Sequence, residues 1–159
     1  SWKGKEFSNE KVLSFKQLLN WQDSHEVNIN YELKCDKTNP DKVVTILSKE
    51  LSNRDPKKII ISSFSRKLIA KSIKVIPSYR HALISERLPE SWQDISRELN
   101  LNAWHLNADY LNLSQVRALH GESLKIRVYT VNNRAKYEKM NRFGVDMIMS
   151  DYPEKFLNF

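Results

Sequence analysis

Two side chains of opposite charge stand two residues apart in the stretch 28–34, and a carboxylate and an ammonium can together handle a metal ion and a phosphate. Glu32 and Lys34 share one face of this alternating stretch with Asn28 and Asn30, and apolar side chains share the other face. A period of two is typical of a β-strand. One interpretation is an edge strand whose polar face is solvated. If flanking helices place the strand in a parallel sheet, we expect both faces to be buried, and the charged pair then needs a function.

Polar side chains also follow the other expected strands, at the point where each strand ends. His105 is the one histidine that we expect to face a site, because it lies at such a strand end, whereas His25, His81 and His120 fit surface or packing positions. The polar strand ends are Glu32 and Lys34, Ser62 and Ser63, His105 and Asn107, Thr130 and Asn132, and Ser150 and Asp151.

Strands and helices alternate along the chain. Caps and apolar spacing predict helices at about 15–22, after Asn39-Pro40, after Ser65, after Ser91, around 113–119 with a stop at Gly121, and from 135 to Gly144. The capping-box spacing of Ser14 and Gln17 begins the first of these helices. Short apolar or alternating runs predict strands at 27–34, 57–62, 79–84, 103–106, 125–130 and 145–149.

Strict alternation of strands and helices predicts a parallel sheet, either open and doubly wound or closed into a barrel. The chain holds only three glycines and no glycine-rich phosphate loop, which argues against a dinucleotide fold. Because a barrel gathers its strand ends at one mouth, the polar strand ends favour a TIM-type (β/α)8 barrel. We expect one domain over residues 1–159 with six of the eight strands, the two N-terminal strands being missing.

Composition sets the outer limits on function. The 159 residues, 40% hydrophobic and 10% aromatic, suit one folded domain. The net charge of +7 is scattered along the chain without a recognition motif, so nucleic-acid binding ranks last among the functions considered. A single cysteine, Cys35, fits a reducing cytoplasm, and no apolar run approaches the roughly 20 residues of a membrane span. The first residue is Ser1, so the sequence cannot test for a signal peptide.

Taken together, these segments resemble the glycerophosphodiester phosphodiesterase family, in the right order along almost the whole chain. Residues 14–19 also look like the helix that precedes the family's Glu-x-Lys strand, and 92–107 resembles its short bacterial cytoplasmic branch. The matching segments are 30–34 for the family's Ile-Glu-Ile-Lys strand, 62–64 for its Ser-Ser-Phe turn, 129–132 for Trp-Thr-Val-Asn, and 144–153 for its closing Gly-Val-Asp motif, which ends in Thr-Asp-x-Pro.

Three expected motifs have no counterpart. Members of the family begin with a His-Arg-Gly strand, a second strand ending Glu-x-Asp and a His-Asp turn, which together carry the paired catalytic histidines and two of the three carboxylate metal ligands. None of these motifs stands in the 159 residues. From the resemblance we infer a fragment, a split reading frame or a chain that begins inside the domain.

The resemblance implies a role for each matching residue. Glu32 would be the third carboxylate on a divalent cation, Mg²⁺ or Ca²⁺, and Lys34 would be the catalytic cation that contacts the phosphoryl oxygens. Tyr129 stands where the family has Trp and would pack against the glycerol carbons, or it is a plain strand residue. Ser63, His105 and Asn132 complete the expected substrate contacts.

Two functions stay open. The first is metal-dependent hydrolysis of a glycerophosphodiester to glycerol phosphate and an alcohol, a step of phospholipid breakdown, with this piece inactive by itself. The second is a catalytically dead partial barrel that acts, if at all, as an interaction module. Two missing strands would leave unpaired backbone at both ends of the sheet, and such edges invite self-association.

Overall fold

The computed structural model describes residues 4–5, 8–34 and 39–156, so Cys35 lies outside the described residues. Its strands are β1 (Ile29–Glu32), β2 (Ile59–Ser63), β3 (Arg80–Ser85), β4 (Ala103–Asn107), β5 (Lys125–Tyr129) and β6 (Met147–Ile148). Its α-helices are α1 (Phe15–His25), α2 (Pro40–Leu51), α3 (Arg66–Val75), α4 (Trp92–Glu98), α5 (Leu113–Gly121) and α6 (Arg134–Phe143). Two 3-10 turns, η2 (Pro56–Lys58) and η3 (Pro153–Lys155), complete the elements named here.

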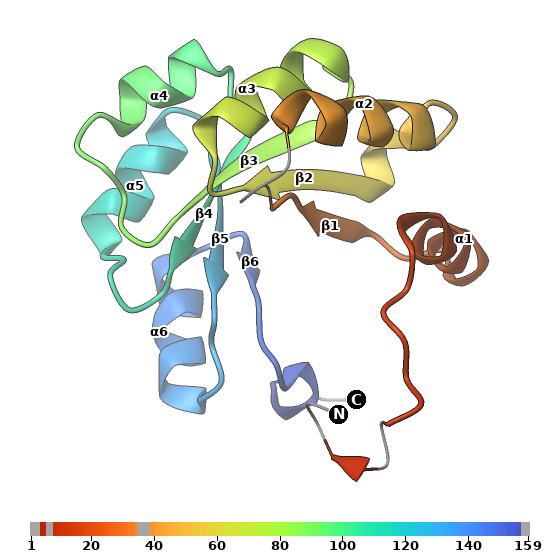
Figure 1. Cartoon of the computed structure of the whole chain (residues 1–159). Helices are drawn as coiled ribbons and strands as arrows, with labels where there is room; N and C mark the ends of the chain where they lie inside the picture. The colour runs from red at the N-terminus through yellow and green to blue at the C-terminus, as the bar shows by residue number, and fades with distance from the viewer. Residues whose placement is uncertain (1–3, 6–7, 35–38, 157–159) are drawn as a thin grey trace.

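The six strands form one parallel sheet in the order β1-β2-β3-β4-β5-β6. Each strand therefore pairs with the next one along the chain, as in a TIM barrel. The sheet curls, and helices lie along its outer side (Figure 1). The predicted incomplete barrel of six parallel strands is confirmed.

Most predicted helix starts are confirmed by their caps. Ser14 and Gln17 form the predicted capping box, and the side chains of Asn39 and Ser65 accept hydrogen bonds from the first turns of α2 and α3. Ser91 precedes α4, but its side chain makes no capping hydrogen bond, because its backbone is not extended (φ −83°, ψ 21°). Ser and Thr cap best from the extended conformation.

Two helix ends show what glycine does here. Gly144 follows α6 with φ +79°, the left-handed conformation that a residue without Cβ adopts without strain. Gly121 is instead the last residue of α5, and Ser123 takes the positive φ of 59° two residues later. The predicted end of the helix at Gly121 is confirmed. The predicted reason was wrong, because Gly121 is still helical and Ser123, not the glycine, takes the left-handed conformation.

The first and last strands are shorter than predicted. β6 covers only Met147–Ile148 instead of 145–149, because Asp146 uses its carboxylate and its amide to hold Ile126 at the start of β5. β1 covers Ile29–Glu32 instead of 27–34, and only the amide of Leu33, which donates to Ser62 O at 2.7 Å, carries the pairing further. Each is an edge strand of the described sheet and pairs on one side only.

The two faces of the sheet differ in chemistry. On the outer face, alternate strand residues pack against the helices in two apolar clusters, one around Trp104, Leu106 and Ile126 and one around Tyr31 and Ile61. Paired residues of a parallel sheet point the same way. The register therefore places the other set on the inner, concave face. Its members are Asn30, Glu32, Ile60, Ser62, Arg80, Ala82, Ile84, Ala103, His105, Asn107, Lys125, Arg127, Tyr129 and Met147.

Candidate active site

The carboxyl ends of the strands surround a cavity of about 250 Å³, which we call the mouth cavity. Side chains from β1, β4, β5 and the segment after β6 meet there, although these segments are far apart in the sequence. Among its lining residues are Asn30, Glu32, Phe64, His105, Tyr129 and Asp151. Barrel enzymes of the (β/α)8 type place their chemistry at this edge, so the mouth cavity is the candidate active site.

Glu32 lines the mouth cavity, and Lys34, which is outside the lining, forms an open ion pair with it at the rim. Lys34 Nζ stands 3.7 Å from Glu32 Oε1, and 34% of the Glu32 side chain and 76% of the Lys34 side chain are exposed. The expectation that both would be buried was wrong, because β1 is an edge strand of the described sheet and its inner face opens at the mouth. Both groups are free to meet a ligand, since neither is held in the core.

His105 lies deeper and is buried. Arg127 donates from Nη1 to His105 Nε2 over 3.2 Å, and a guanidinium has no acceptor, so Nε2 must be the unprotonated nitrogen. Burial, and then the charge of Arg127, lowers the pKa of His105 to about 3. At neutral pH this histidine is therefore a neutral ring with its proton on Nδ1, which can donate a hydrogen bond but is a poor base.

The far side of the mouth cavity is formed where β5 and β6 end. Asn132 binds the segment after β6 with both ends of its amide: Nδ2 donates to Asp151 Oδ2 at 2.8 Å, and Oδ1 accepts from the Asp151 amide at 3.0 Å. The Ser150 hydroxyl donates to the same Oδ1 at 3.2 Å. Asn132 does not itself line the cavity, but it fixes Asp151, which does.

Two aromatic rings stand over the mouth cavity. Tyr129 lies edge to face with Phe64, their centroids 6.3 Å apart, and the Phe64 residue is 57% exposed. Burial, and then the carboxylates of Glu86 and Glu32, raises the pKa of Tyr129, so its phenol stays neutral. Together the two rings give this polar mouth one apolar wall.

Ser63 lies outside the lining of the mouth cavity. Its hydroxyl donates to Leu33 O at 2.7 Å and accepts from the Ser65 amide at 3.1 Å, and the residue is 2% exposed. Ser63 therefore ties the end of β1 to the turn that begins α3. The inward neighbour, Ser62, is also buried.

The site also draws on residues that were not among the expected substrate and metal contacts. Asn30 and Phe64 line the mouth cavity, although only Glu32, Lys34, Ser63, His105, Tyr129 and Asn132 were expected to act there. Asn30 could have been found from the alternation that found Glu32, because it stands two residues earlier on the same face. Asp151 was expected among the polar strand ends and does line the cavity, but its hydrogen bonds to Asn132 join two loops, which spacing along one chain does not reveal.

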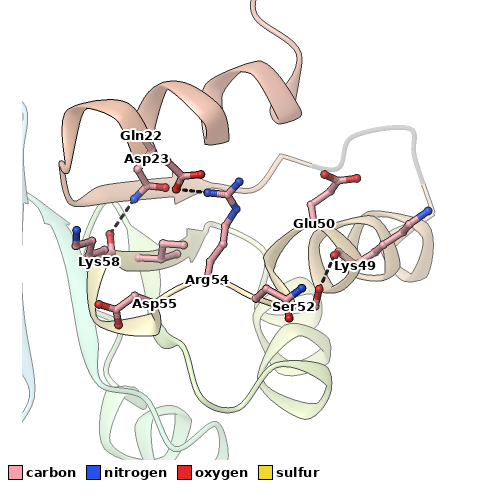
Figure 2. Close-up of a pocket in the computed structure, with 10 residues that line it drawn as sticks. Gln22, Asp23, Lys49, Glu50, Ser52, Arg54, Asp55 and Lys58 are labelled. Carbon is pink, nitrogen blue, oxygen red and sulfur yellow. Dashed lines mark hydrogen bonds and ion pairs between the residues drawn. The ribbon is translucent and has the colours of Figure 1, made fainter.

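A larger cavity, about 640 Å³, lies at the opposite edge of the sheet, beside α1, the end of α2 and the start of β2. Figure 2 shows an ion pair between Asp23 and Arg54 there, and the amide of Gln22 donating to Lys58 O at 3.3 Å. These interactions tie α1 to the loop between α2 and β2. Because this edge of a barrel serves stability, size alone does not make the cavity a second candidate.

Comparison with known proteins identifies the family. The model of the glycerophosphoryl diester phosphodiesterase family matches residues 1–155. The chain belongs to this family. A glycerophosphodiester phosphodiesterase of Bacillus subtilis (strain 168) is 28% identical over 156 residues, which cover 92% of this chain and 53% of that protein. The enzyme of the same name from Caldanaerobacter subterraneus is 24% identical over 98% of this chain and 64% of its own length.

A solved relative has the same fold. An Oleispira antarctica phosphodiesterase, in complex with the product sn-glycerol-3-phosphate, superposes with a TM-score of 0.91 at 22% identity. The match covers 98% of this chain and 64% of that one. The chain of this phosphodiesterase family member thus spans about half to two thirds of the relatives that it matches.

The described residues do not form a complete metal site of the kind expected for this phosphodiesterase family. No group of three His, Cys, Asp or Glu side chains suited to a metal ion occurs in the part of the chain that the structure describes. Glu32 and Asp151 both line the mouth cavity, but Asp151 already accepts a hydrogen bond from Asn132. Hard divalent cations take six or more oxygen ligands, so Glu32 by itself falls well short.

Over the same described residues, no helix is long and apolar enough to cross a membrane.

Proposed function

We propose that this chain is part of an enzyme that hydrolyses glycerophosphodiesters to glycerol phosphate and an alcohol, and that the reaction takes place at the mouth cavity. The observation that carries the proposal is the exposed pair of Glu32 and Lys34 at the rim of that cavity, in a chain of this family. Exposed charges 3.7 Å apart contribute little to stability, so packing does not account for their presence.

Each of the expected site residues has a role in this proposal. Lys34 donates to the phosphoryl oxygens and stabilises the negative charge that builds there in the transition state. Tyr129 packs its ring against the glycerol carbons. His105 donates a hydrogen bond from Nδ1, since Arg127 occupies its other nitrogen. Asn132 and Ser63 act through the loops that they hold, next to Asp151 and Leu33 respectively.

A divalent cation, Mg²⁺ or Ca²⁺, belongs to the proposal with Glu32 as one of its ligands. The remaining ligands must come from outside the described residues, because those residues hold no suitable group of three. By resemblance to its family, the proposal also places the protein in the cytoplasm and in phospholipid breakdown.

The proposal includes poor turnover by the 159-residue chain alone. General acid-base catalysis contributes about 10² to 10⁴-fold in rate, and it needs a group that exchanges protons near neutral pH. Among the described histidines only His105 lines the mouth cavity, and its pKa of about 3 makes it a poor base. His25 stacks on Trp21, His120 pairs with Asp146, and His81 is buried on the outer face.

An assay for release of glycerol phosphate from glycerophosphocholine tests the proposal. We expect slow turnover that EDTA abolishes and that Glu32→Gln lowers at least tenfold, with Glu122→Gln, at an exposed carboxylate after α5, as the matched control. Turnover that neither EDTA nor Glu32→Gln affects would contradict the assignment of the mouth cavity. Rapid turnover by the wild-type chain would contradict the absence of a working acid-base pair.

A second candidate function rests on the sheet edges. Within the described residues β1 and β6 each pair with one neighbour only, and unpaired strand edges template association. In this case the chain is an interaction module without catalysis, and sedimentation equilibrium should show dimers or larger species at micromolar concentration. A monomer that binds sn-glycerol-3-phosphate would decide for the enzyme.

A further inference from the structure

Below the mouth cavity, the inner face of the sheet carries two arginines without a carboxylate partner. Arg127 is 7% exposed, and its one side-chain hydrogen bond among the described residues goes to the neutral ring of His105. Arg80 donates from Nη2 to the Lys57 carbonyl, while its Nε is buried without any partner. Neither guanidinium forms an ion pair within the described chain.

These two side chains also repel each other. Burial is the main cause that lowers the pKa of Arg127, and the positive charge of Arg80 lowers it further. The negative charge of Asp146, which directly precedes β6, raises the pKa of Arg127. However, the Asp146 carboxylate already bonds to Lys125, His120 and the Ile126 amide. A buried guanidinium without a carboxylate is strongly unfavourable, so the inner face is short of one negative charge.

A hydroxyl on the same face is also unsatisfied. Ser62 is fully buried, and its Oγ has no hydrogen-bond partner in the part of the chain that the structure describes. The register places Ser62 beside Ala82, and Ala82 is two residues from Arg80 on the same face of β3. Ser62 and Arg80 therefore lie diagonally across the β2–β3 pair, and Ser62 Oγ and Arg80 Nε are both donors that a carboxylate can accept from. Asn30 Oδ1, the remaining unpartnered atom of this face, is an acceptor and would not bind to it.

We propose that Arg80, Arg127 and Ser62 form a carboxylate-binding site inside the barrel. An acidic side chain on a strand that pairs with a free edge of the sheet can supply the carboxylate, and so can a dissolved carboxylic acid. The chemistry is the same for both sources: one anion held by two guanidiniums and a hydroxyl. The site lies deeper than the mouth cavity and does not depend on the proposed hydrolysis.

The first arm of the test uses acetate as the probe. Thermal melts of the 159-residue chain are compared in 100 mM sodium acetate and 100 mM sodium chloride at pH 7.5. We expect acetate to raise Tm by about 3–6 °C, the shift that a tenfold excess of ligand over Kd gives a domain of this size. Arg127→Met should abolish the shift, and Arg97→Met, an exposed arginine on α4, should keep it.

The second arm tethers the carboxylate to a strand. Ala82→Glu and Ala82→Gln add side chains of equal size at the fully buried position beside Ser62. We expect the glutamate variant to melt above the glutamine variant and to lose the response to acetate, because its own side chain fills the site. In the Arg127→Met background the order should reverse, since a buried glutamate then lacks its partner.

The outcomes separate the alternatives. A response to acetate without a gain from Ala82→Glu assigns the site to dissolved carboxylates, whereas both effects together favour a strand-borne acid. Equal Tm in acetate and chloride, with Ala82→Glu melting below Ala82→Gln, would overturn the proposal. If Arg127→Met does not fold, Ser62→Ala replaces it: loss of an unpartnered hydroxyl should spare the fold and reduce the acetate shift at least twofold.

Discussion

The same strands form the outer and inner faces of the sheet, but the side chains of the outer face are fully packed, whereas some polar groups of the inner face have no partner among the described residues. The outer face meets helices of its own chain, and its large side chains, such as Trp104, Leu106 and Ile126, are at most 1% exposed. On the inner face, Ser62 Oγ and Arg80 Nε are buried without partners among the described residues, and none of these residues supplies a carboxylate to Arg127. A strand-helix unit thus completes its outer packing locally, whereas inner packing needs strands from across the barrel.

The largest effect should come from breaking the outer face. Trp104 is fully buried and donates from Nε1 to Ser96 Oγ at 2.9 Å. Trp104→Ala should lower the free energy of unfolding by about 3–5 kcal/mol, since it removes the contacts and leaves a cavity. Met147→Ala, at a residue that is 45% exposed on the β6 edge, should stay within about 1 kcal/mol. Urea melts at pH 7.5 measure both, and similar losses for the two variants would contradict the contrast between the faces.

Acid should lower the free energy of unfolding through one buried histidine on each face of the sheet. Burial lowers the pKa of His81, on the outer face, to about 4, and burial with Arg127 lowers that of His105 to about 3. Because the unfolded chain takes up these protons near pH 6.5, it binds more protons than the folded chain below that pH, and stability falls as the pH falls. The loss between pH 6.5 and 5.5 should be about 2 kcal/mol in total.

Single variants divide this acid effect between the faces. His81→Gln and His105→Gln should each remove about half of the loss, as urea melts at pH 6.5 and 5.5 would show. Asp146 acts in another range: burial raises its pKa, but the hydrogen bonds from Lys125 and the Ile126 amide outweigh burial and hold it at about 2. Its contribution is therefore lost only below about pH 4. Stability that is flat from pH 6.5 to 5.5 would contradict the neutral state of both histidines.

Sequence periodicity found the outer face better than the inner one. The apolar run 59–61 and the spacing of Leu113, Val116 and Leu119 predict elements because each packs against its own neighbours, which the chain order specifies. The expected burial of Glu32 and Lys34 failed, because exposure at a barrel mouth depends on which strands stand opposite. The contact of Arg127 with His105 depends on the register of β4 against β5, which no local pattern specifies.

The smallest effect on stability should be at the rim. Glu32→Gln and Lys34→Met should each change the free energy of unfolding by less than about 1 kcal/mol, because both groups are exposed at a distance of 3.7 Å. A loss of about 3–5 kcal/mol for either variant would mean that the pair is structural, as for a buried ion pair that loses one partner. If the pair is structural in this way, the Tm of the wild-type chain should also be the same with and without Mg²⁺.

The central claim is that the mouth cavity, formed where the strands end, binds the glycerol phosphate part of the substrate. The direct measurement is a titration of the ¹⁵N-labelled 159-residue chain with sn-glycerol-3-phosphate in the presence of Mg²⁺, followed by NMR amide shifts. We predict saturable shifts at Glu32, Tyr129 and Asp151, and a weaker response after Lys34→Met. Shifts confined to the larger cavity beside Asp23 and Arg54, or no saturable shifts at all, would contradict the claim.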